Sequence, residues 1–292
     1  MPTEKIELNL GGCAANVAAN LAKFNVPVVL SGCVGDDTFS NFIVQSVAHP
    51  QTDVSRIQRT IGCPGTALHI NVQGQDRRFI GTTGANDHYR FDEELFQLLT
   101  ESTLEQPKIF YLGGFFMLRA LESERTVQFF KTARQHGWTT LLDVVLYGNR
   151  PYWDIVRPLL PHTDIFLPNG HEGETITGER NPYEQAKRFL GAGVGAAIIT
   201  QGEWGTLYVS EKERFRVGVY PTNYVSGAGA GDAFDAGLIA ALHEGHDHRE
   251  AVRWGSAQGA SCVREVSTTG GVFNRAELLE CIDKYELVFE EI

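Results

Sequence analysis

The spacing of apolar residues changes repeatedly along the chain between the period of a helix and the continuous run of a buried strand. Residues 13–24 are alanine-rich, with Val17, Leu21 and Phe24 on one helical face. Residues 28–34 then form an apolar run that a turn ends, which predicts a buried strand. Strands that alternate with helices in this way are typical of an α/β protein with a mostly parallel sheet.

The segment between Asp53 and Asn86 breaks this alternation. Short runs with strand character, RIQRTIG, TALHINV and RRFIG, are separated by turn residues, and helical periods are scarce. This pattern predicts antiparallel strands in a small sheet that projects from the main domain. Ile6, Leu8 and Leu10 alternate with polar residues, which adds one half-buried strand. We therefore expect a β-sheet lid formed by about residues 3–10 and 54–84.

The alternation resumes after Phe91, and no internal repeat or long linker interrupts it. Strands are predicted at 108–113, 139–144, 164–167 and 196–200, a hairpin at 206–210 and 214–219, and helices at 39–47, 123–136, 152–160, 173–177, 182–190, 248–263 and 274–285. A further helix follows the glycine run at 227–231. A length of 292 residues suits one large α/β domain or two small ones, and the unbroken pattern favours a single domain over 1–292.

Charge and cysteine content narrow the classes of partner. The net charge of −11 argues against nucleic acid and against anionic membranes. The amino terminus does not lead into a signal peptide, and no apolar run is long enough to span a bilayer. The five cysteines show no CxxC spacing and are interpreted as reduced side chains. These features predict a cytoplasmic protein.

The run Gly227-Ala228-Gly229-Ala230-Gly231 is the strongest chemical signal. A glycine-rich loop that opens a helix exposes backbone N–H groups at the positive end of the helix dipole and forms an anion site, most often for phosphate. Asp232 follows the run directly. Its carboxylate is interpreted either as a general base for a hydroxyl that attacks phosphorus, or as an acidic residue that complements the start of the helix.

Two further groups follow predicted strands, at the edge where open α/β sheets bind ligands. Asn169 and Glu172 suit a hydrated Mg²⁺, or else a capping box at a helix start. Thr200, Gly202 and Gly205 suit contacts with nucleotide phosphate, or else the turn of a hairpin.

Polar and glycine residues near the amino terminus form another group. Gly11 and Gly12, with Asn16 one turn later, suit hydrogen bonding to a polyhydroxylated ligand, or else a close approach of helix and strand. The histidines of HEGHDH, residues 243–248, are interpreted as a solvated helix end rather than a metal site.

Taken in order, these motifs resemble the PfkB-type carbohydrate kinases of the ribokinase-like superfamily. The resemblance runs from about Gly11 to about Gly271 and rests on five motifs. They are GGCAANVA at 11–18 with GCVGDD at 32–37, GAGDAF at 229–234, Gly84-Ala85-Asn86, Asn169-x-x-Glu172 and Thr200-x-Gly202.

The resemblance implies a three-layer α/β/α core with a mostly parallel sheet and a β lid. It also implies transfer of the γ-phosphoryl group of ATP to a hydroxyl of a sugar or sugar-like substrate. Asp232 would be the general base, and the Gly229–Gly231 loop, with Ala230 in its middle, would form the anion hole. Gly11, Gly12, Asn16 and Asn86 would bind substrate, Thr200, Gly202 and Gly205 would bind nucleotide, and Asn169 and Glu172 would hold Mg²⁺ through water. A nucleoside kinase and a non-catalytic sugar or nucleotide sensor of the same fold are the alternatives.

The chain departs from the family pattern at two places. Ser226-Gly227-Ala228 stands where relatives carry Asp-Thr, and that Asp supports a monovalent-cation site, so we expect little stimulation by potassium. Only ten residues precede Gly11, where relatives carry a first strand and a sugar-binding Asp. We expect either an upstream strand in a longer reading frame or a homodimer that pairs through the lid. Arg77 and Arg78 suit an anionic substrate, or else are exposed strand charges.

Overall fold

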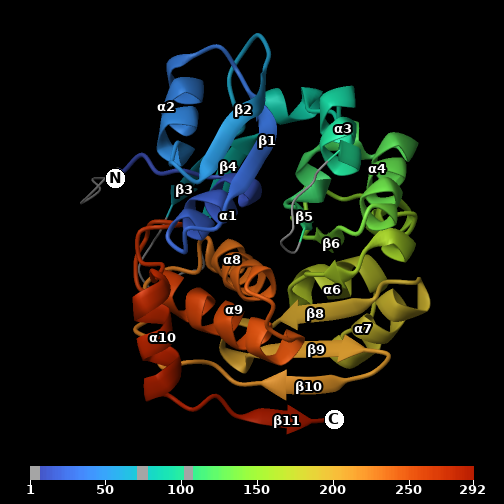
Figure 1. Cartoon of the computed structure of the whole chain (residues 1–292), viewed down its shortest axis with the longest axis vertical. Coiled ribbons are helices and arrows are strands. Elements are labelled where there is room, and N and C mark those ends of the chain that lie inside the picture. Colours follow the sequence, from blue (N-terminus) through green and yellow to red (C-terminus); the bar gives the residue numbers. More distant parts are fainter. Residues whose placement is uncertain (1–6, 71–77, 102–107) are drawn as a thin grey trace.

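A seven-stranded mixed sheet forms the middle layer of the molecule in a computed structural model that describes residues 7–70, 78–101 and 108–292 (Figure 1). Its strand order is β11-β10-β9-β8-β7-β6-β5. The strands are β5 (Ile109–Leu112), β6 (Thr139–Leu142), β7 (Ile165–Phe166), β8 (Ala196–Thr200), β9 (Thr206–Ser210), β10 (Arg214–Val217) and β11 (Phe289–Glu291). Neighbours from β5 to β8 are parallel, and those from β8 to β11 are antiparallel. The carboxyl ends of β5 to β8 therefore meet at one edge of the sheet.

Helices cover both faces of this sheet and confirm the three-layer α/β/α fold. One face packs against α3 (Glu93–Glu101), α4 (Glu124–Gln135), α5 (Tyr152–Val156), α6 (Gly170–Thr177) and α7 (Pro182–Gly191). The other packs against α1 (Cys13–Ala22), α8 (Ala230–His243), α9 (His248–Cys262) and α10 (Arg275–Lys284). Strand β8 shows the alternation: Ala197 and Ile199 join the first core, and Ala196 and Ile198 join the second. Helices α1 and α8, far apart in sequence, lie side by side (Figure 1).

A second, two-stranded sheet corrects the predicted arrangement of the early strands. Strand β1 (Val28–Val34) pairs in parallel with β2 (Thr52–Arg59), and α2 (Thr38–Val47) makes the crossover between them. The RIQRTIG run, residues 56–62, was expected in an antiparallel lid, but most of it belongs to this parallel pair. A helix long enough to reverse the chain direction allows the parallel return. The β1 strand is only partly buried, since Val29 is 45% exposed.

One antiparallel pair of strands lies within the segment predicted as a lid, of which residues 71–77 are outside the described part. Strands β3 (Thr66–Ile70) and β4 (Arg78–Thr82) pair antiparallel and leave Leu68 and Ile80 exposed. The predicted strand at 3–10 is wrong for residues 7–10, which form no strand; residues 3–6 lie outside the described part. The Leu10 carbonyl instead accepts a hydrogen bond from the Thr268 hydroxyl at 2.8 Å.

Most predicted elements after residue 91 are found within a few residues of their expected bounds. Helix α3 and strand β11 were not predicted. Strand β11 spans only three residues, whereas α3 buries Leu95 and Leu99 at helical spacing, a signal that could have indicated it. No helix in the described ranges is both long and apolar enough to cross a membrane.

Candidate active site

The start of helix α8 presents backbone N–H groups that no described carbonyl satisfies. Gly229 precedes the helix in the left-handed conformation, with φ 78°, and a Cβ there would lie 2.6 Å from the Thr268 carbonyl oxygen. The Ala230 N–H makes a long bond, 3.4 Å, to the Gly227 carbonyl. The N–H groups of Gly231 and Asp232 have no backbone acceptor among the described residues. The glycine loop thus has the open donors that an anion requires.

Helix α1 holds the Asp232 carboxylate from the opposite side. Asn16, which is buried, donates its side-chain N–H to Asp232 Oδ2 at 2.7 Å. The Thr268 hydroxyl, whose single proton has its shorter contact with the Leu10 carbonyl at 2.8 Å, lies 3.2 Å from the carbonyl oxygen of the same amide. Gly12, at φ 95°, precedes α1 and allows the turn that brings Asn16 to this position. Asp232 and Asn16, both predicted site residues, therefore lie in contact.

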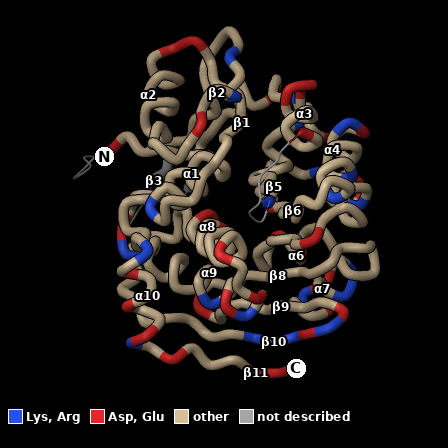
Figure 2. Tube along the Cα trace, in the orientation of Figure 1, with Lys and Arg blue, Asp and Glu red and all other residues tan. Residues whose placement is uncertain are grey.

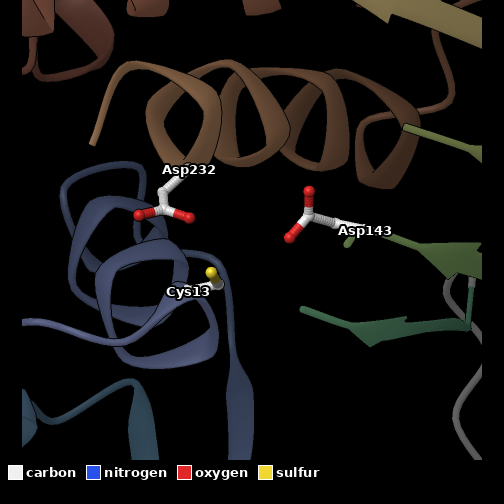
Figure 3. A group of neighbouring side chains, drawn as sticks. All are labelled: Cys13, Asp143 and Asp232. Atoms are coloured by element: carbon white, nitrogen blue, oxygen red, sulfur yellow. The ribbon is translucent and has the colours of Figure 1, made fainter. Parts of the chain in front are cut away.

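Three side chains from three different elements face one shared space (Figure 3). Cys13 comes from the first turn of α1, Asp143 from the residue after β6, and Asp232 from α8. One ligand atom from each lies within 4.8 Å of those of the other two. This space adjoins the open amides of α8.

Burial and mutual repulsion raise the pKa of the carboxyl groups in this region. Burial raises the pKa of Asp232, and hydrogen bonds from Asn16 and the Cys13 thiol partly offset it. The pKa of Asp143 is raised well above its usual value by burial and then by the charges of Asp235 and Glu172. Burial likewise raises the pKa of Asp235, although its carboxylate accepts a hydrogen bond from the Tyr111 hydroxyl at 2.8 Å. A carboxylate with a raised pKa accepts a proton more readily.

Asn169 and Glu172 form the capping box that the sequence leaves as one alternative. Asn169 Oδ1 accepts from the N–H groups of His171 and Glu172, and Glu172 Oε2 accepts from the Asn169 N–H at 2.8 Å. Glu172 is buried, which raises its pKa to about 7, although its bonds to Asn169 act in the opposite direction. Its second oxygen, Oε1, has no donor among the described residues.

The structure brings part of the predicted nucleotide group next to this cap. Thr200, at the end of β8, forms an isolated parallel bridge with Asn169. Gly202 has φ 57° and open space around it, whereas a Cβ on Gly205 would lie 1.9 Å from the Val217 carbonyl oxygen. The close packing of the β8–β9 turn therefore requires glycine at position 205.

The remaining predicted substrate residues lie around the small sheets. Asn86 belongs to a 3-10 turn at Gly84–His88, and Gly65 leaves room for its amide, since a Cβ on Gly65 would lie 2.6 Å from Asn86 Nδ2. Gly11 is exposed beside Gly12. No hydrogen bond among the described residues joins Asn86 to Asp232.

Cys13, Asp143, Asp235 and Tyr111 were not predicted as site residues. Asp143 interrupts the apolar run LLDVV at a strand end, and Asp235 interrupts the apolar face of α8. Isolated acidic residues in apolar runs are the signal that could have indicated both. The histidines at 243–248 do not form a metal-ligand cluster among the described residues. His248 Nδ1 instead forms a hydrogen bond with the Tyr208 hydroxyl at 2.6 Å.

Charge is distributed unevenly between this site and the outer surface. Figure 2 shows acidic residues at the start of α8 and both acidic and basic residues on outer helices such as α4 and α7.

Comparison with known proteins gives one family and several close folds. The model of the pfkB family carbohydrate kinases matches residues 2–273. A 2-dehydro-3-deoxygluconokinase of Bacillus subtilis is 27% identical over 97% of this chain and 89% of its own length. An Arabidopsis thaliana ribokinase solved with ribose and ATP is 22% identical, with a TM-score of 0.81 over 96% of this chain and 92% of that one. A structure from Escherichia coli solved with ATP and Mg²⁺ is 24% identical, with a TM-score of 0.77 over 98% of this chain and 94% of that one.

Proposed function

The protein belongs to the pfkB family of carbohydrate kinases, and from that premise we propose that it transfers the γ-phosphoryl group of ATP to a hydroxyl of a sugar or sugar-like acceptor, with Asp232 as the general base. One observation supports this most: the Asp232 carboxylate, held by Asn16, lies next to two N–H groups that have no backbone acceptor in the described part of the chain. A base and an anion site side by side suit phosphoryl transfer to a neutral hydroxyl.

The reaction follows from this placement. Asp232 accepts the proton of the acceptor hydroxyl as that oxygen forms its bond to the γ-phosphorus. The bond between the γ-phosphorus and the bridging oxygen breaks, and ADP leaves with the bonding electrons. The amides of Gly231 and Asp232, with the weakly engaged amide of Ala230, donate to the equatorial oxygens of the transferred group. Gly229 acts through the backbone conformation that points these donors into the site.

The residues around the helix cap fit a hydrated cation and a nucleotide. Glu172 Oε1 remains free to accept from a metal-bound water, while Oε2 and the Asn169 side chain hold the cap. Mg²⁺ bound there would neutralise phosphate charge. Thr200, which forms a bridge with Asn169, and Gly202, two residues later, would contact nucleotide phosphate, and Gly205 would shape that turn.

The acceptor would lie among Gly11, Gly12, Asn16 and Asn86. Asn16 also orients Asp232, so it contributes to both binding and catalysis. At the proposed monovalent-cation position, the Ser226 hydroxyl accepts from the Ala228 N–H at 3.3 Å and supplies no charge. ATP supply and the five free thiols support a cytoplasmic location.

A panel of acceptors tests the proposal. Sugars, sugar acids, amino sugars and nucleosides are each incubated with ATP and Mg²⁺, and ADP release is compared with a blank that lacks acceptor. We expect at least one sugar-like compound to raise ADP release well above the blank. Release with nucleosides alone would favour a nucleoside kinase, and release with no compound would favour a sensor.

A further inference from the structure

Asp143 is a charged residue of the site that the proposed mechanism leaves without a task. Its Oδ2 accepts from the Gly114 N–H at 2.9 Å, and its main chain bonds Leu112 and Phe115. The other oxygen, Oδ1, has no donor among the described residues. The carboxylate lies across the shared space from Asp232, with the Cys13 thiol beside both (Figure 3).

Tight glycine contacts fix the wall that carries Asp143. A Cβ on Gly113 would lie 2.9 Å from the Cys13 Cβ, and one on Gly114 would lie 3.1 Å from the Cys13 sulfur. Gly114 also has φ 66°, so other residues there are strained. The Gly114 amide that donates to the Asp143 carboxylate is therefore held in place by close contacts of the backbone.

The charges around this space are of one sign. The charged groups that most affect the pKa of Asp143 are Asp235, Glu172 and Asp232, all acidic. Among the described residues, the hydrogen bonds that lower the pKa of Asp232 come from neutral groups, the Asn16 amide and the Cys13 thiol. An acceptor that carried a carboxylate or phosphate close to the reacting hydroxyl would meet this repulsion without a described counter-charge.

We propose that Asp143 is a second acceptor-binding carboxylate, which receives a hydrogen bond from a hydroxyl or ammonium group on the carbon next to the reacting hydroxyl. The two donors of a vicinal diol or amino alcohol can each reach one of two carboxylates whose oxygens are a few ångströms apart. The pocket therefore selects neutral or cationic acceptors over sugar acids and sugar phosphates. This inference rests on the proposed function and adds the acceptor class to it.

The first arm of the test compares acceptors that differ only in charge. Each trio shares one carbon skeleton: a neutral sugar or polyol, its aldonic acid and its amino sugar, for example glucitol, gluconate and glucamine. We expect the best neutral or cationic compound to exceed its acidic counterpart at least tenfold in kcat/KM. An acidic acceptor preferred within its trio overturns the inference but leaves the kinase activity standing. No ADP release with any charge class overturns both.

The second arm tests the contact itself. The best acceptor is compared with its deoxy analogue, which lacks the donor next to the phosphorylated carbon, in the wild type and in Asp143→Asn. A hydrogen bond to a charged group corresponds to about 10- to 100-fold in kcat/KM. In the wild type, we expect kcat/KM to fall by that factor when the deoxy analogue replaces the best acceptor. In Asp143→Asn the same replacement should lower kcat/KM by less than about threefold, because the variant has already lost the charged hydrogen-bond acceptor.

Asp235→Asn is the matched control, because it removes one neighbouring charge that is directed at Tyr111. It should keep the full penalty for the deoxy analogue. Equal penalties in the wild type and Asp143→Asn would show that Asp143 only supports Gly114, and that would overturn the inference. If Asp143→Asn fails to fold, as judged by thermal unfolding, the trios in the wild type decide the question.

Discussion

Glu172 illustrates how one residue can serve both the fold and the chemistry. One of its oxygens completes a helix cap, and the other has no hydrogen-bond donor among the described residues although the side chain is buried. The sequence left the capping and Mg²⁺ interpretations as alternatives. The geometry makes them compatible, because each interpretation uses a different oxygen of the same carboxylate.

The Mg²⁺ requirement tests this double role. Glu172→Gln keeps an oxygen for the cap but loses the charge that would hold a metal-bound water. We expect the Mg²⁺ concentration for half-maximal activity to rise about tenfold or more, with a smaller change in the acceptor KM. Glu174→Gln, an exposed change on the same helix, is the control. An unchanged Mg²⁺ requirement in Glu172→Gln would leave that residue with the cap alone.

Stability should also depend on pH through Glu172. Its pKa in the folded protein is about 7, above the usual value, so its neutral form favours folding below the unfolded pKa. This contribution is lost as pH rises through about 7. Relative to Glu172→Gln, the wild type should therefore lose up to about 3 kcal/mol of unfolding free energy between pH 5 and pH 8. Urea unfolding at both pH values measures it, and a parallel pH dependence in the two proteins would contradict it.

At the scale of elements, the loop-to-helix junction could be predicted from the sequence, while the position of Asp143 near Asp232 could not. The run at 227–231 predicts both the turn and the exposed backbone N–H groups at the start of α8, because glycine tolerates the left-handed conformation found at Gly229. Asp143 carries no local motif, and its role depends on which strand end lies opposite α8. That juxtaposition is set by the strand order, which periodicity does not encode.

Substitution by alanine should change the free energy of unfolding in opposite directions at two glycines of this junction. Gly229→Ala places a Cβ 2.6 Å from the Thr268 carbonyl oxygen at positive φ, and should cost about 1–3 kcal/mol of unfolding free energy. Gly231→Ala meets nothing within 4 Å in a helix, and should be neutral or stabilise by up to about 1 kcal/mol. Chemical denaturation compares them, and equal stabilities would refute the left-handed requirement at Gly229.

At the scale of the whole molecule, the three layers could be predicted from the sequence, but the pairing of the early strands could not. Changes in the spacing of apolar residues predicted the order of helices and strands. The parallel β1–β2 pair, however, depends on where α2 packs, and that spacing does not encode this. Within the described ranges β1 pairs only with β2, and β5 pairs only with β6. Both sheets therefore present a strand edge without a described partner.

We expect unpartnered edges to favour association of two copies through the lid region, since free strand edges template pairing. Sedimentation equilibrium at micromolar protein should then give a mass near twice 32.3 kDa. Proline at Val29, an exposed position of β1, should shift the mass toward one copy while leaving the core folded. A wild-type protein that sediments as a single copy across this range would exclude the dimer.

The most direct measurement of the central claim is single-turnover phosphoryl transfer by Asp232→Asn, at saturating ATP, Mg²⁺ and the best acceptor of the panel. The variant retains an oxygen for Asn16 but cannot take the hydroxyl proton. Transfer should fall by about 100-fold or more, while the ATP dissociation constant changes little. Transfer within a few-fold of the wild type would contradict the assignment of Asp232 as the base.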